Sequence, residues 1–412
     1  MKKLYLSFLV IGLFASALLQ AQQNKCGFAY TMEQARARGF RDDAFEAEIA
    51  RLIQQKLQQQ GQGRLFFTGP VTLPVIFHVI HRGETEGGIG SQNLSQAIIQ
   101  AQLNQLNADF ANLSGSLYAG IATDVQIQFC LAQQDPGGVA LAQPGIHRIN
   151  GITQGWSDVN TGAAFDSPGE IIAYFDGTIK PASIWDPTRY INIWTADMNA
   201  SGLLGYASFP ALSGLPGLPN SETDLSAGVV MAAGSAGSVS TLGYAAPYNM
   251  GRTLTHELGH FFGLRHIWGD GDCTATDYCA DTPPQDQETA GCPAPGTLNN
   301  CIPNVPKMFE NYMDYSNDAC LNTFTADQAI RMQTVMDFSP RRLSLITSTA
   351  CTPPVPNAIS FLTTTTATTE APTVLTCPRY KEVTVSLRAA VAASGNATVT
   401  FNLAGTALNV AD

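Results

Sequence analysis

The stretch HELGHFFGLRH at residues 256–266 constrains this chain more than any other feature of its 412 residues. Only six histidines occur in the chain, and three of them lie within this stretch. On an α-helix, residues four positions apart face the same side, so His256 and His260 can direct their imidazoles at one point. Gly263 can take the left-handed backbone that ends a helix, which lets the chain turn and bring His266 to the same point. The spacing therefore predicts a metal site with two ligands on a helix and a third after a turn.

Three imidazoles in this arrangement are typical of a catalytic zinc site, because zinc binds histidine nitrogen at about 2.0–2.1 Å and keeps one position open for water. Zinc lowers the pKa of such a water to about 7. Glu257 follows the first ligand and can take the proton of that water without binding the metal. Two core histidines on an amphipathic helix would explain HExxH alone, but they would not explain the longer pattern HExxHxxGxxH. The residues thus predict zinc-dependent hydrolysis of peptide bonds.

The long histidine motif and the segment Asn311-Tyr-Met-Asp-Tyr315 that follows it together resemble the metzincin metallopeptidases. Within that group, the order of Trp268-Gly-Asp-Gly-Asp-Cys273, Gly291-Cys-Pro293 and Asp318-Ala-Cys320 is similar to the pappalysin family, over about residues 70–345. The resemblance implies an α/β (α+β) catalytic domain with a twisted mixed sheet, an active-site helix and an irregular, disulfide-stapled C-terminal subdomain. It also implies that Met313 forms an apolar floor beneath the ligands. Tyr315 would donate a hydrogen bond to the oxyanion of the tetrahedral intermediate, unless it is an ordinary structural tyrosine.

The loop after the third histidine holds five of the nine cysteines and little periodic structure. The resemblance implies the disulfides Cys273–Cys301 and Cys292–Cys320, and it leaves Cys279 as an extra cysteine that could also replace Cys273 in the first bridge. The family binds calcium in this loop, and calcium needs several oxygen ligands. The candidates for such a site are Asp277 and the carbonyls near Gly271, Cys279 and Thr282; a merely solvated acidic loop is the alternative.

Substrate recognition can also be inferred from the resemblance. Asp318 corresponds to an aspartate that lines the S1′ pocket, and a carboxylate there would pair with arginine, or more weakly lysine, directly after the scissile bond. The alternative for Asp318 is a surface residue without a role in binding. The stretch Leu204, Gly205, Tyr206 and Ala207 would hold the peptide as an added antiparallel strand.

The N-terminus predicts export and latency. Met1-Lys-Lys3 followed by an apolar run from Leu4 to Leu19 has the layout of a secretory signal peptide, here residues 1–21. Outside the cytoplasm cysteines tend to pair, and an odd count leaves one over, for which Cys26 is the best candidate. A thiolate is a strong zinc ligand, and Cys26-Gly27 resembles the switch cysteine of the family, which would keep a zymogen silent.

Alternatives to this cysteine switch remain open. Asp42 or Asp43 could replace Cys26 as the inhibitory ligand, and Cys26 could instead pair with Cys130. The partners of Cys351 and Cys377 are not indicated by the sequence. Activation would cut the flexible stretch Gly61–Gly69, in which Arg64 fits the expected specificity if cleavage falls immediately before it.

Periodicity and composition place the remaining segments. Helical spacing predicts helices at residues 43–58 and 94–110, and apolar or alternating runs predict strands at 73–80, 125–129, 190–194, 227–231, 383–387 and 398–401. The domains expected are a signal peptide at 1–21, a pro-segment at 22–69, a catalytic domain at 70–348, and a Thr/Pro linker with a partial β-rich domain at 349–412. A net charge of −11 with 13% charged residues leaves no basic face for nucleic acid.

The sequence therefore predicts a secreted or cell-surface zinc endopeptidase that acts on protein or peptide substrates as a monomer and is inhibited by its own pro-segment. Zinc is the expected catalytic metal and calcium the expected structural one, and no membrane span is expected in the mature protein. A metzincin of another branch with a different specificity is the nearest alternative. The other is a non-catalytic secreted protein that retains the fold for binding, which the intact Glu257 disfavours.

Overall fold

The structure is a computed structural model of the chain. It describes residues 25–61, 69–87, 90–160, 165, 167–210, 214–215, 225–237, 246–354, 359–361 and 387–389. Among these residues, no helix is both long and apolar enough to cross a bilayer.

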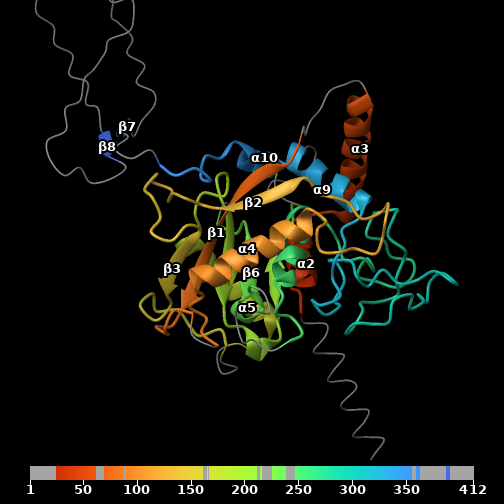
Figure 1. Ribbon diagram of the computed structural model, residues 1–412, viewed down its shortest axis with the longest axis horizontal. Coiled ribbons are helices and arrows are strands. Elements are labelled where there is room, and N and C mark those ends of the chain that lie inside the picture. The colour runs from red at the N-terminus through yellow and green to blue at the C-terminus, as the bar shows by residue number, and fades with distance from the viewer. Residues whose placement is uncertain are drawn as a thin grey trace, which may run out of the picture.

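A twisted, mainly parallel sheet forms the centre of the molecule (Figure 1). Its strands run in the order β2-β1-β4-β6-β5, and β3 pairs with β1. The long central strand β1 pairs with β2 along its first half and with β3 along its second half, while β5 is the antiparallel edge strand. Eight consecutive residues of β1 are buried, because helices cover both faces of the sheet. The strands are β1 (Val71–His81), β2 (Ile127–Leu131), β3 (Ile146–Asn150), β4 (Ile191–Ala196), β5 (Gly205–Ala207) and β6 (Val229–Ala232).

The two faces of the sheet bury different cores. Alternate residues of β1, such as Val75 and Phe77, pack with apolar residues of α4 and α8 on one face. Trp194 of β4 and Val230 of β6 point to the other face and pack with Phe175 beneath α5 and η1. The edge strand β5 contacts α8, the helix that carries the histidine motif. The helices of this body are α4 (Gln96–Phe110), α5 (Pro168–Tyr174), the π-helix η1 (Phe175–Ile179), α6 (Lys180–Ser183), α8 (Arg252–Phe261), α9 (Ala326–Phe338) and α10 (Pro340–Leu343), with 3₁₀ turns at η2 (Asn199–Ser201), η4 (Ala233–Ser235) and η5 (Ser344–Thr347).

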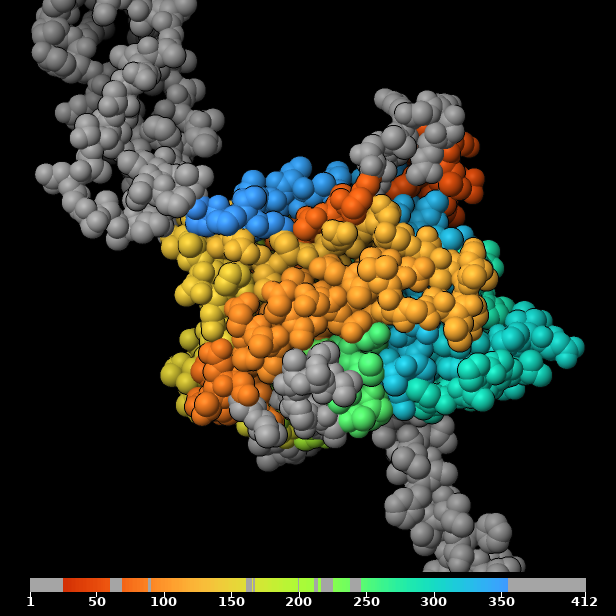
Figure 2. Space-filling model, viewed as in Figure 1, coloured from red at the N-terminus to blue at the C-terminus, as the bar shows by residue number. Residues whose placement is uncertain are grey.

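The segment between α8 and α9 has no regular helix or strand, and it forms a lobe that projects from one side of the molecule (Figure 2). Two disulfides close this lobe, Cys273–Cys301 and Cys292–Cys320, which are the pairs that the resemblance implies. Cross-links of this kind constrain a segment that buries little apolar surface of its own. α9 then begins with a complete capping box between Thr325 and Gln328.

Residues 25–61 form a helical hairpin that packs on the body made of the sheet and its covering helices. Its helices are α2 (Phe28–Ala37) and α3 (Asp42–Gly61), and α3 lies against α9. The buried Lys56 ammonium of α3 lies 2.6 Å from the Asp337 carboxylate of α9. This buried ion pair joins α3 to α9.

The mixed α/β fold agrees with the sequence analysis, and the helices and strands predicted within residues 43–266 are present, with strand ends shifted by a residue or two. Helices α2, α5, α6, α9 and α10 and strand β3 were not predicted; Ile146–Asn150 of β3 is short and half polar. The third disulfide, Cys130–Cys351, corrects the alternative pairing of Cys130 with Cys26. β7 (Ile359–Phe361) and β8 (Leu387–Ala389) pair with each other, whereas the expected strand at 398–401, most of that at 383–387, and Cys377 lie outside the described residues.

Candidate active site

The histidine motif forms the predicted helix and turn. α8 runs from Arg252 to Phe261, and within it the Nε2 atoms of His256 and His260 lie 3.1 Å apart. Gly263 follows with φ of +94°, and a Cβ added there would lie 2.9 Å from Val335 Cγ2, so both the backbone and the space require glycine. The turn returns His266, whose Nε2 lies 3.2 Å from that of His260. All three imidazoles therefore converge at one point, as the spacing predicts.

The hydrogen bonds of the three rings indicate what this point can hold. His256 Nδ1 lies 2.7 Å from the Tyr312 carbonyl oxygen, and His260 Nδ1 lies 2.8 Å from the Leu264 carbonyl oxygen. A carbonyl oxygen can only accept, so each Nδ1 carries the proton and each Nε2 presents a lone pair. Two nitrogens bound at about 2.0–2.1 Å to one tetrahedral ion would lie about 3.3 Å apart, close to the separations here. Lone pairs this close repel one another unless a cation lies between them, so the three rings fit a metal ion.

Burial keeps the imidazoles in the form that binds metal. Desolvation, and then the neighbouring His266, lower the pKa of His256 to about 3. The same two causes hold the pKa of His260 well below its usual value. His266 Nδ1 lies 2.5 Å from Asp270 Oδ1, which orients the third ring through a carboxylate. Such partners of the ligating histidines fix ring orientation and raise ligand basicity.

Glu257 lies beside the point where the three imidazoles converge, called the metal point below, but it is not one of the groups that converge there. Its side chain is buried, and its Oε2 has no hydrogen-bond partner. Burial raises the pKa of Glu257 to about 8, although a hydrogen bond from the Cys26 thiol opposes the shift. Gly205 of β5 allows this closeness, because a Cβ there would lie 2.9 Å from Glu257 Oε1. An unpaired buried carboxylate oxygen is costly to maintain, and it is placed where an incoming water or peptide could bind it.

A fourth group joins the three histidines. One ligand atom from each of Cys26, His256, His260 and His266 lies within 4.8 Å of the others. Cys26 is buried, and burial, followed by the charge of Glu257, raises the pKa of its thiol well above the usual value. That direction applies to the metal-free protein, in which no cation stabilises the thiolate. The sulfur is thus placed at the position that a fourth ligand would take.

The floor and wall of the site come from Met313 and Tyr315, which lie in the last part of the segment between α8 and α9. Met313 is fully buried beneath α8, and a Cβ on Gly259 would lie 2.4 Å from its Sδ atom. The Tyr315 ring lies 5.0 Å from that of His266 and 5.8 Å from that of His256, centroid to centroid. Both residues therefore lie where the sequence analysis expects them.

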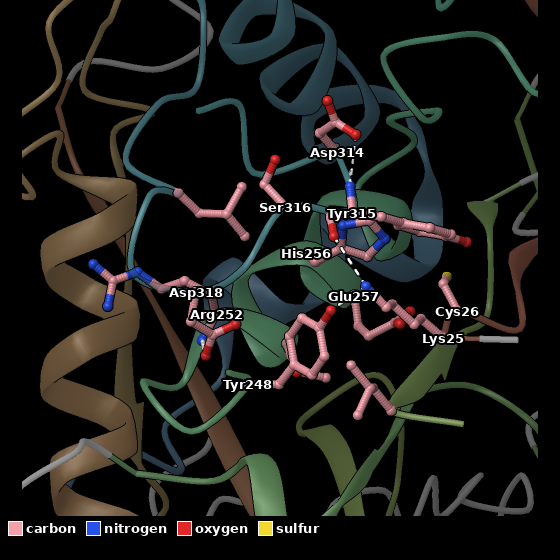
Figure 3. A pocket seen from close by; sticks show the side chains of 13 residues that line it. Lys25, Cys26, Tyr248, Arg252, His256, Glu257, Asp314, Tyr315, Ser316 and Asp318 are labelled. Atoms are coloured by element: carbon pink, nitrogen blue, oxygen red, sulfur yellow. Dashed lines mark hydrogen bonds between the residues drawn. The ribbon is translucent and has the colours of Figure 1, made fainter. Parts of the chain in front are cut away.

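A pocket opens beside the metal point, and Figure 3 shows Lys25 entering it from the N-terminal segment. The Lys25 ammonium donates to the Tyr315 carbonyl oxygen at 3.1 Å and to the Tyr248 hydroxyl. Burial lowers the pKa of Lys25 to about 8. The negative charge of Asp314 and of other nearby carboxylates opposes this shift. Asp318 lines the same pocket, where its Oδ2 accepts from the backbone N–H of Met250 at 2.8 Å. The pocket therefore holds a basic side chain near buried carboxylates.

The outer edge of β5 bonds to the N-terminal segment. Leu204 N–H donates to the Lys25 carbonyl oxygen at 2.8 Å, and Gly27 N–H donates to the Gly205 carbonyl oxygen at 2.9 Å. The bridge between Cys26 and Gly205 is parallel. Of the predicted substrate-binding stretch, Tyr206 and Ala207 pair with β6 on the inner side. The chain at Cys26 thus follows β5 in the same direction.

The candidate calcium residues are only partly brought together. Asp277 is buried and accepts from Thr282 Oγ1 at 2.9 Å and from Cys279 N–H at 3.1 Å, and burial raises its pKa to about 7. The Thr282 Oγ1 atom also lies 2.8 Å from the Cys279 carbonyl oxygen, so these three residues form one compact group. Gly271 instead contacts Trp268 and Ala275.

Sequence reasoning missed several residues of this site. Asp270 follows His266 by four residues, but the chain between them forms a turn and not a helix, so helical spacing could not identify Asp270 as the partner of the ligand. Phe28 stacks on His260 with centroids 4.2 Å apart, and no sequence pattern signals this. Lys25 is adjacent to Cys26, yet its position in the pocket depends on the direction in which the segment runs along β5.

Comparisons with known proteins agree with this geometry. The family described as "Pregnancy-associated plasma protein-A" matches residues 174–337. An extracellular metalloprotease of Verticillium alfalfae is 30% identical over 269 residues, which cover 64% of this chain and 76% of that protein. Another, from Arthroderma otae, is 28% identical over 79% of this chain and 95% of its own length.

Solved structures give the same result. A mutant of promirolysin from Tannerella forsythia superimposes with a TM-score of 0.58 at 32% identity, over 78% of this chain and 97% of its own. Mature mirolysin in complex with a cleaved peptide gives a TM-score of 0.55 at 32% identity, over 67% of this chain and 95% of its own. With these relatives and a converging set of metal-binding side chains, the chain belongs to the pappalysin family of metallopeptidases and is a metalloendopeptidase with a catalytic metal.

Proposed function

We propose that this protein is a secreted zinc endopeptidase that is made as a latent zymogen and cleaves peptide bonds before arginine or, less well, lysine. The observation that carries the proposal is the convergence of Cys26 with the three histidines. Three imidazoles with free Nε2 lone pairs and one thiol match the donor preferences of zinc. The relatives named as extracellular metalloproteases support secretion, as does the signal-like N-terminus.

In catalysis, zinc on His256, His260 and His266 would polarise the scissile carbonyl and acidify water. Glu257 would act as general base, because its unpaired Oε2 can accept a proton from the attacking water, and the carboxyl group so formed could then pass that proton to the leaving amine. Tyr315 would donate its phenolic hydrogen to the developing oxyanion, a role worth about 3 kcal/mol in other enzymes. Met313 would hold the ligands from below.

The Lys25 pocket supports basic specificity. A peptide lying antiparallel to β5 would place the residue after the scissile bond on the Leu204 side, which is where Lys25 now enters the pocket. Asp318 is the predicted determinant, and burial raises its pKa to about 6, so it is ionised at neutral pH. A guanidinium in this pocket could form a charge-assisted bond to that carboxylate.

Latency would depend on Cys26 rather than on the two aspartates considered from the sequence. Asp42 pairs with Arg36 at 2.7 Å and with Arg265 at 2.9 Å, and Asp43 pairs with Arg41 at 2.8 Å on the surface. Neither belongs to the group around the metal point. Cys26 would exclude water from the metal until the pro-segment, residues 22–69, is removed.

Activation would cut between α3, which ends at Gly61, and β1, which begins at Val71. Arg64 lies in this connection but outside the described residues. The catalytic domain would then be residues 70–348, followed by the Thr/Pro linker and a partial β-rich domain at 349–412. A structural calcium ion near Asp277, Cys279 and Thr282 is proposed on the strength of their clustered oxygens alone.

The test uses the intact chain and its Glu257→Gln variant. Metal analysis and X-ray absorption of the intact chain should give one zinc with one sulfur and three nitrogens in its first shell, and processing should remove the sulfur. The processed parent should cleave casein and lose activity to a zinc chelator, while the variant should bind zinc but leave casein intact. A sulfur-free metal shell in the intact chain would refute the latency mechanism. Zinc-loaded, processed protein that digests nothing would instead favour a binding protein with this fold.

A further inference from the structure

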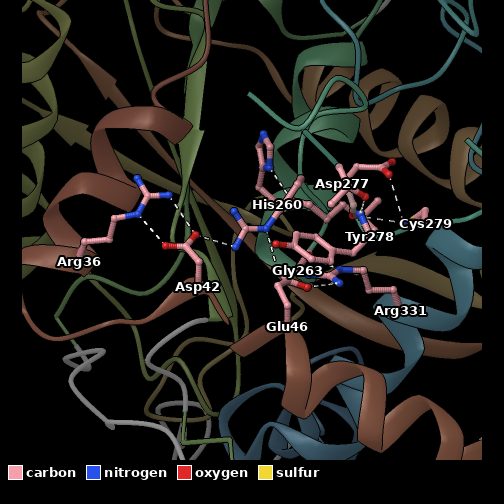
Figure 4. A network of polar contacts seen from close by, with 12 residues as sticks. Arg36, Asp42, Glu46, His260, Gly263, Asp277, Tyr278, Cys279 and Arg331 are labelled. Carbon is pink, nitrogen blue, oxygen red and sulfur yellow. Dashed lines mark hydrogen bonds and ion pairs between the residues drawn. The ribbon is translucent and has the colours of Figure 1, made fainter. Parts of the chain in front are cut away.

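Two arginines form a cation pair directly behind the turn that carries the third histidine. Arg265 Nε lies 2.7 Å from Glu46 Oε1, while Arg331 Nη1 lies 2.6 Å from Glu46 Oε2. Arg331 Nη2 also donates to Glu46 Oε1 at 2.9 Å, so one carboxylate of α3 bridges both guanidinium groups (Figure 4). All three side chains are buried. The arrangement is a complete carboxylate-binding site whose present occupant comes from the N-terminal segment.

The catalytic body supplies few acceptors to this pair. Arg331 Nε donates to the Gly263 carbonyl oxygen at 2.7 Å, which ties it to the turn between the second and third histidines. The Tyr278 ring lies 5.5 Å from Arg265 Cζ and 5.8 Å from Arg331 Cζ. Asp277 attracts Arg331 through its charge, but its carboxylate oxygens already accept bonds from within the lobe.

Removal of the pro-segment would therefore leave these cations without their carboxylate. Arg265 would also lose Asp42, whose Oδ1 lies 2.9 Å from its Nη2. Two guanidinium groups held side by side repel each other, so a carboxylate that binds to both of them is favoured. A planar fork of donors is matched best by a carboxylate, which it binds in a bidentate manner.

We propose that processing exposes a second binding site, formed by Arg265 and Arg331, that takes the carboxylate of an acidic side chain. The inference rests on the proposed processing of the zymogen, and it adds a preference at a position away from Asp318. Two sources could supply the carboxylate: a glutamate or aspartate of the peptide substrate, or Glu46 of the released segment rebinding. Both present the same chemistry.

The position of the pair relative to the cleft favours the substrate as a source. Phe28 stacks on His260, and its ring lies 5.4 Å from that of Phe209. Phe209 also neighbours the arginine pair, because its ring centroid lies 5.7 Å from Arg265 Cζ. Phe209 follows β5 by two residues, so a peptide antiparallel to β5 would pass it with the residues that precede the scissile bond. An acidic side chain a few residues upstream of the cut would then reach the arginines.

The experiment uses processed enzyme, freed of the released segment by gel filtration. Each pair of peptides carries arginine directly after the scissile bond, and its two members differ only in having glutamate or glutamine at the third, fourth or fifth position before that bond. At one of these positions, kcat/KM of the glutamate peptide should exceed that of the glutamine peptide about three- to tenfold. The factor is modest because the ion pair with the arginines is charge-assisted but partly exposed after processing. The ratio should decrease with salt and fall to about one in Arg265→Gln. Since the ratio is taken within one enzyme, any general loss of activity in the variant cancels.

The matched control is Arg189→Gln, which neutralises a partly exposed arginine that donates to the Pro136 carbonyl oxygen, and it should keep the parent ratio. Adding the recovered segment back distinguishes the two sources: if Glu46 rebinds, the segment should inhibit the processed enzyme, and a Glu46→Gln segment should inhibit it less at the same concentration. A ratio of one in the parent at all three positions, together with equal inhibition by the two segments, would overturn the proposal. Intact mass separates this failure from that of the zymogen hypothesis, because an active chain that still carries residues 28–61 would overturn both.

Discussion

Substituting Gly27 by alanine should loosen the docked N-terminal segment, and the effect can be worked out from the contacts of this one residue. A Cβ on Gly27 would lie 2.6 Å from Ile172 Cδ1 and 2.8 Å from Tyr206 Cβ. The isoleucine methyl can rotate away, but Tyr206 Cβ is attached directly to the backbone of β5 and can move only with the strand. Overpacking of this kind costs about 1–3 kcal/mol. Because about 1.4 kcal/mol corresponds to a tenfold change, the open population should rise by about fivefold to 150-fold.

The assay is the rate at which Cys26 reacts with a thiol reagent in the intact chain. Cys26 is buried, so it can be labelled only when the segment opens, and its rate then reports the opening equilibrium. A Glu257→Gln background prevents self-processing, and peptide mass mapping identifies which cysteine is labelled. Cys279 is also free and buried, but it lies in the lobe, so its labelling rate should not change.

The matched control is Gly177→Ala, because a Cβ on Gly177 would have no neighbour within 4 Å. It should leave the labelling of Cys26 at the parent rate. Equal Cys26 rates in Gly27→Ala and the parent would refute the argument that the tight contact with β5 holds the segment closed. Faster labelling of both Cys26 and Cys279 would mean that the substitution destabilises the whole protein.

Three further predictions concern specificity, packing and the metal. The processed enzyme should prefer arginine to methionine directly after the scissile bond, and the kcat/KM ratio of the two substrates should decline as the pH falls below about 6. The decline is expected because burial raises the pKa of Asp318 to about 6, so its carboxylate becomes neutral below that pH. A flat ratio from pH 5 to 8 would exclude Asp318 as the determinant. Gly259→Ala should lower the free energy of unfolding by about 1–3 kcal/mol, since the new Cβ would lie 2.4 Å from Met313 Sδ, and calorimetry should show a lower Tm than for Gly177→Ala. Chelation of zinc should lower the Tm of the parent and have little effect on His260→Ala, which lacks one ligand; an equal shift in both would argue against metal binding at this point.

The sequence predicted the metal point well because every step was local. Positions four apart on a helix, a glycine that ends it and a histidine three residues on leave little freedom for the chain. The same holds for the buried strand β1, whose apolar run is continuous. In both cases, short-range spacing determines which side chains can meet.

Long-range contacts could not be predicted in this way. Glu46 and Arg331 are 285 positions apart in the chain, and their pairing depends on how α3 docks on α9. Lys25 lies in the Asp318 pocket only because residues 25–27 follow β5 in the parallel direction. A single sequence gives no measure of which distant charges approach each other.

The direction of the chain at Cys26 also bears on the proposed latency, because a segment that lies in the cleft in the reverse direction would not be cut there. A substrate proposed to lie antiparallel to β5 would present its carbonyl to the metal and its basic side chain to the Asp318 pocket. The N-terminal segment places Lys25 in that pocket and Cys26 at the metal point, but it runs parallel to β5. Its peptide bonds therefore have the opposite direction to those of the proposed substrate. The affinity of the pocket for a cation would then stabilise the latent state as well as select the substrate. A substitution that weakens recognition of arginine should consequently weaken latency, so an Asp318 variant should label faster at Cys26 than the parent does. If its specificity changed while its labelling rate did not, the pocket would serve substrates alone.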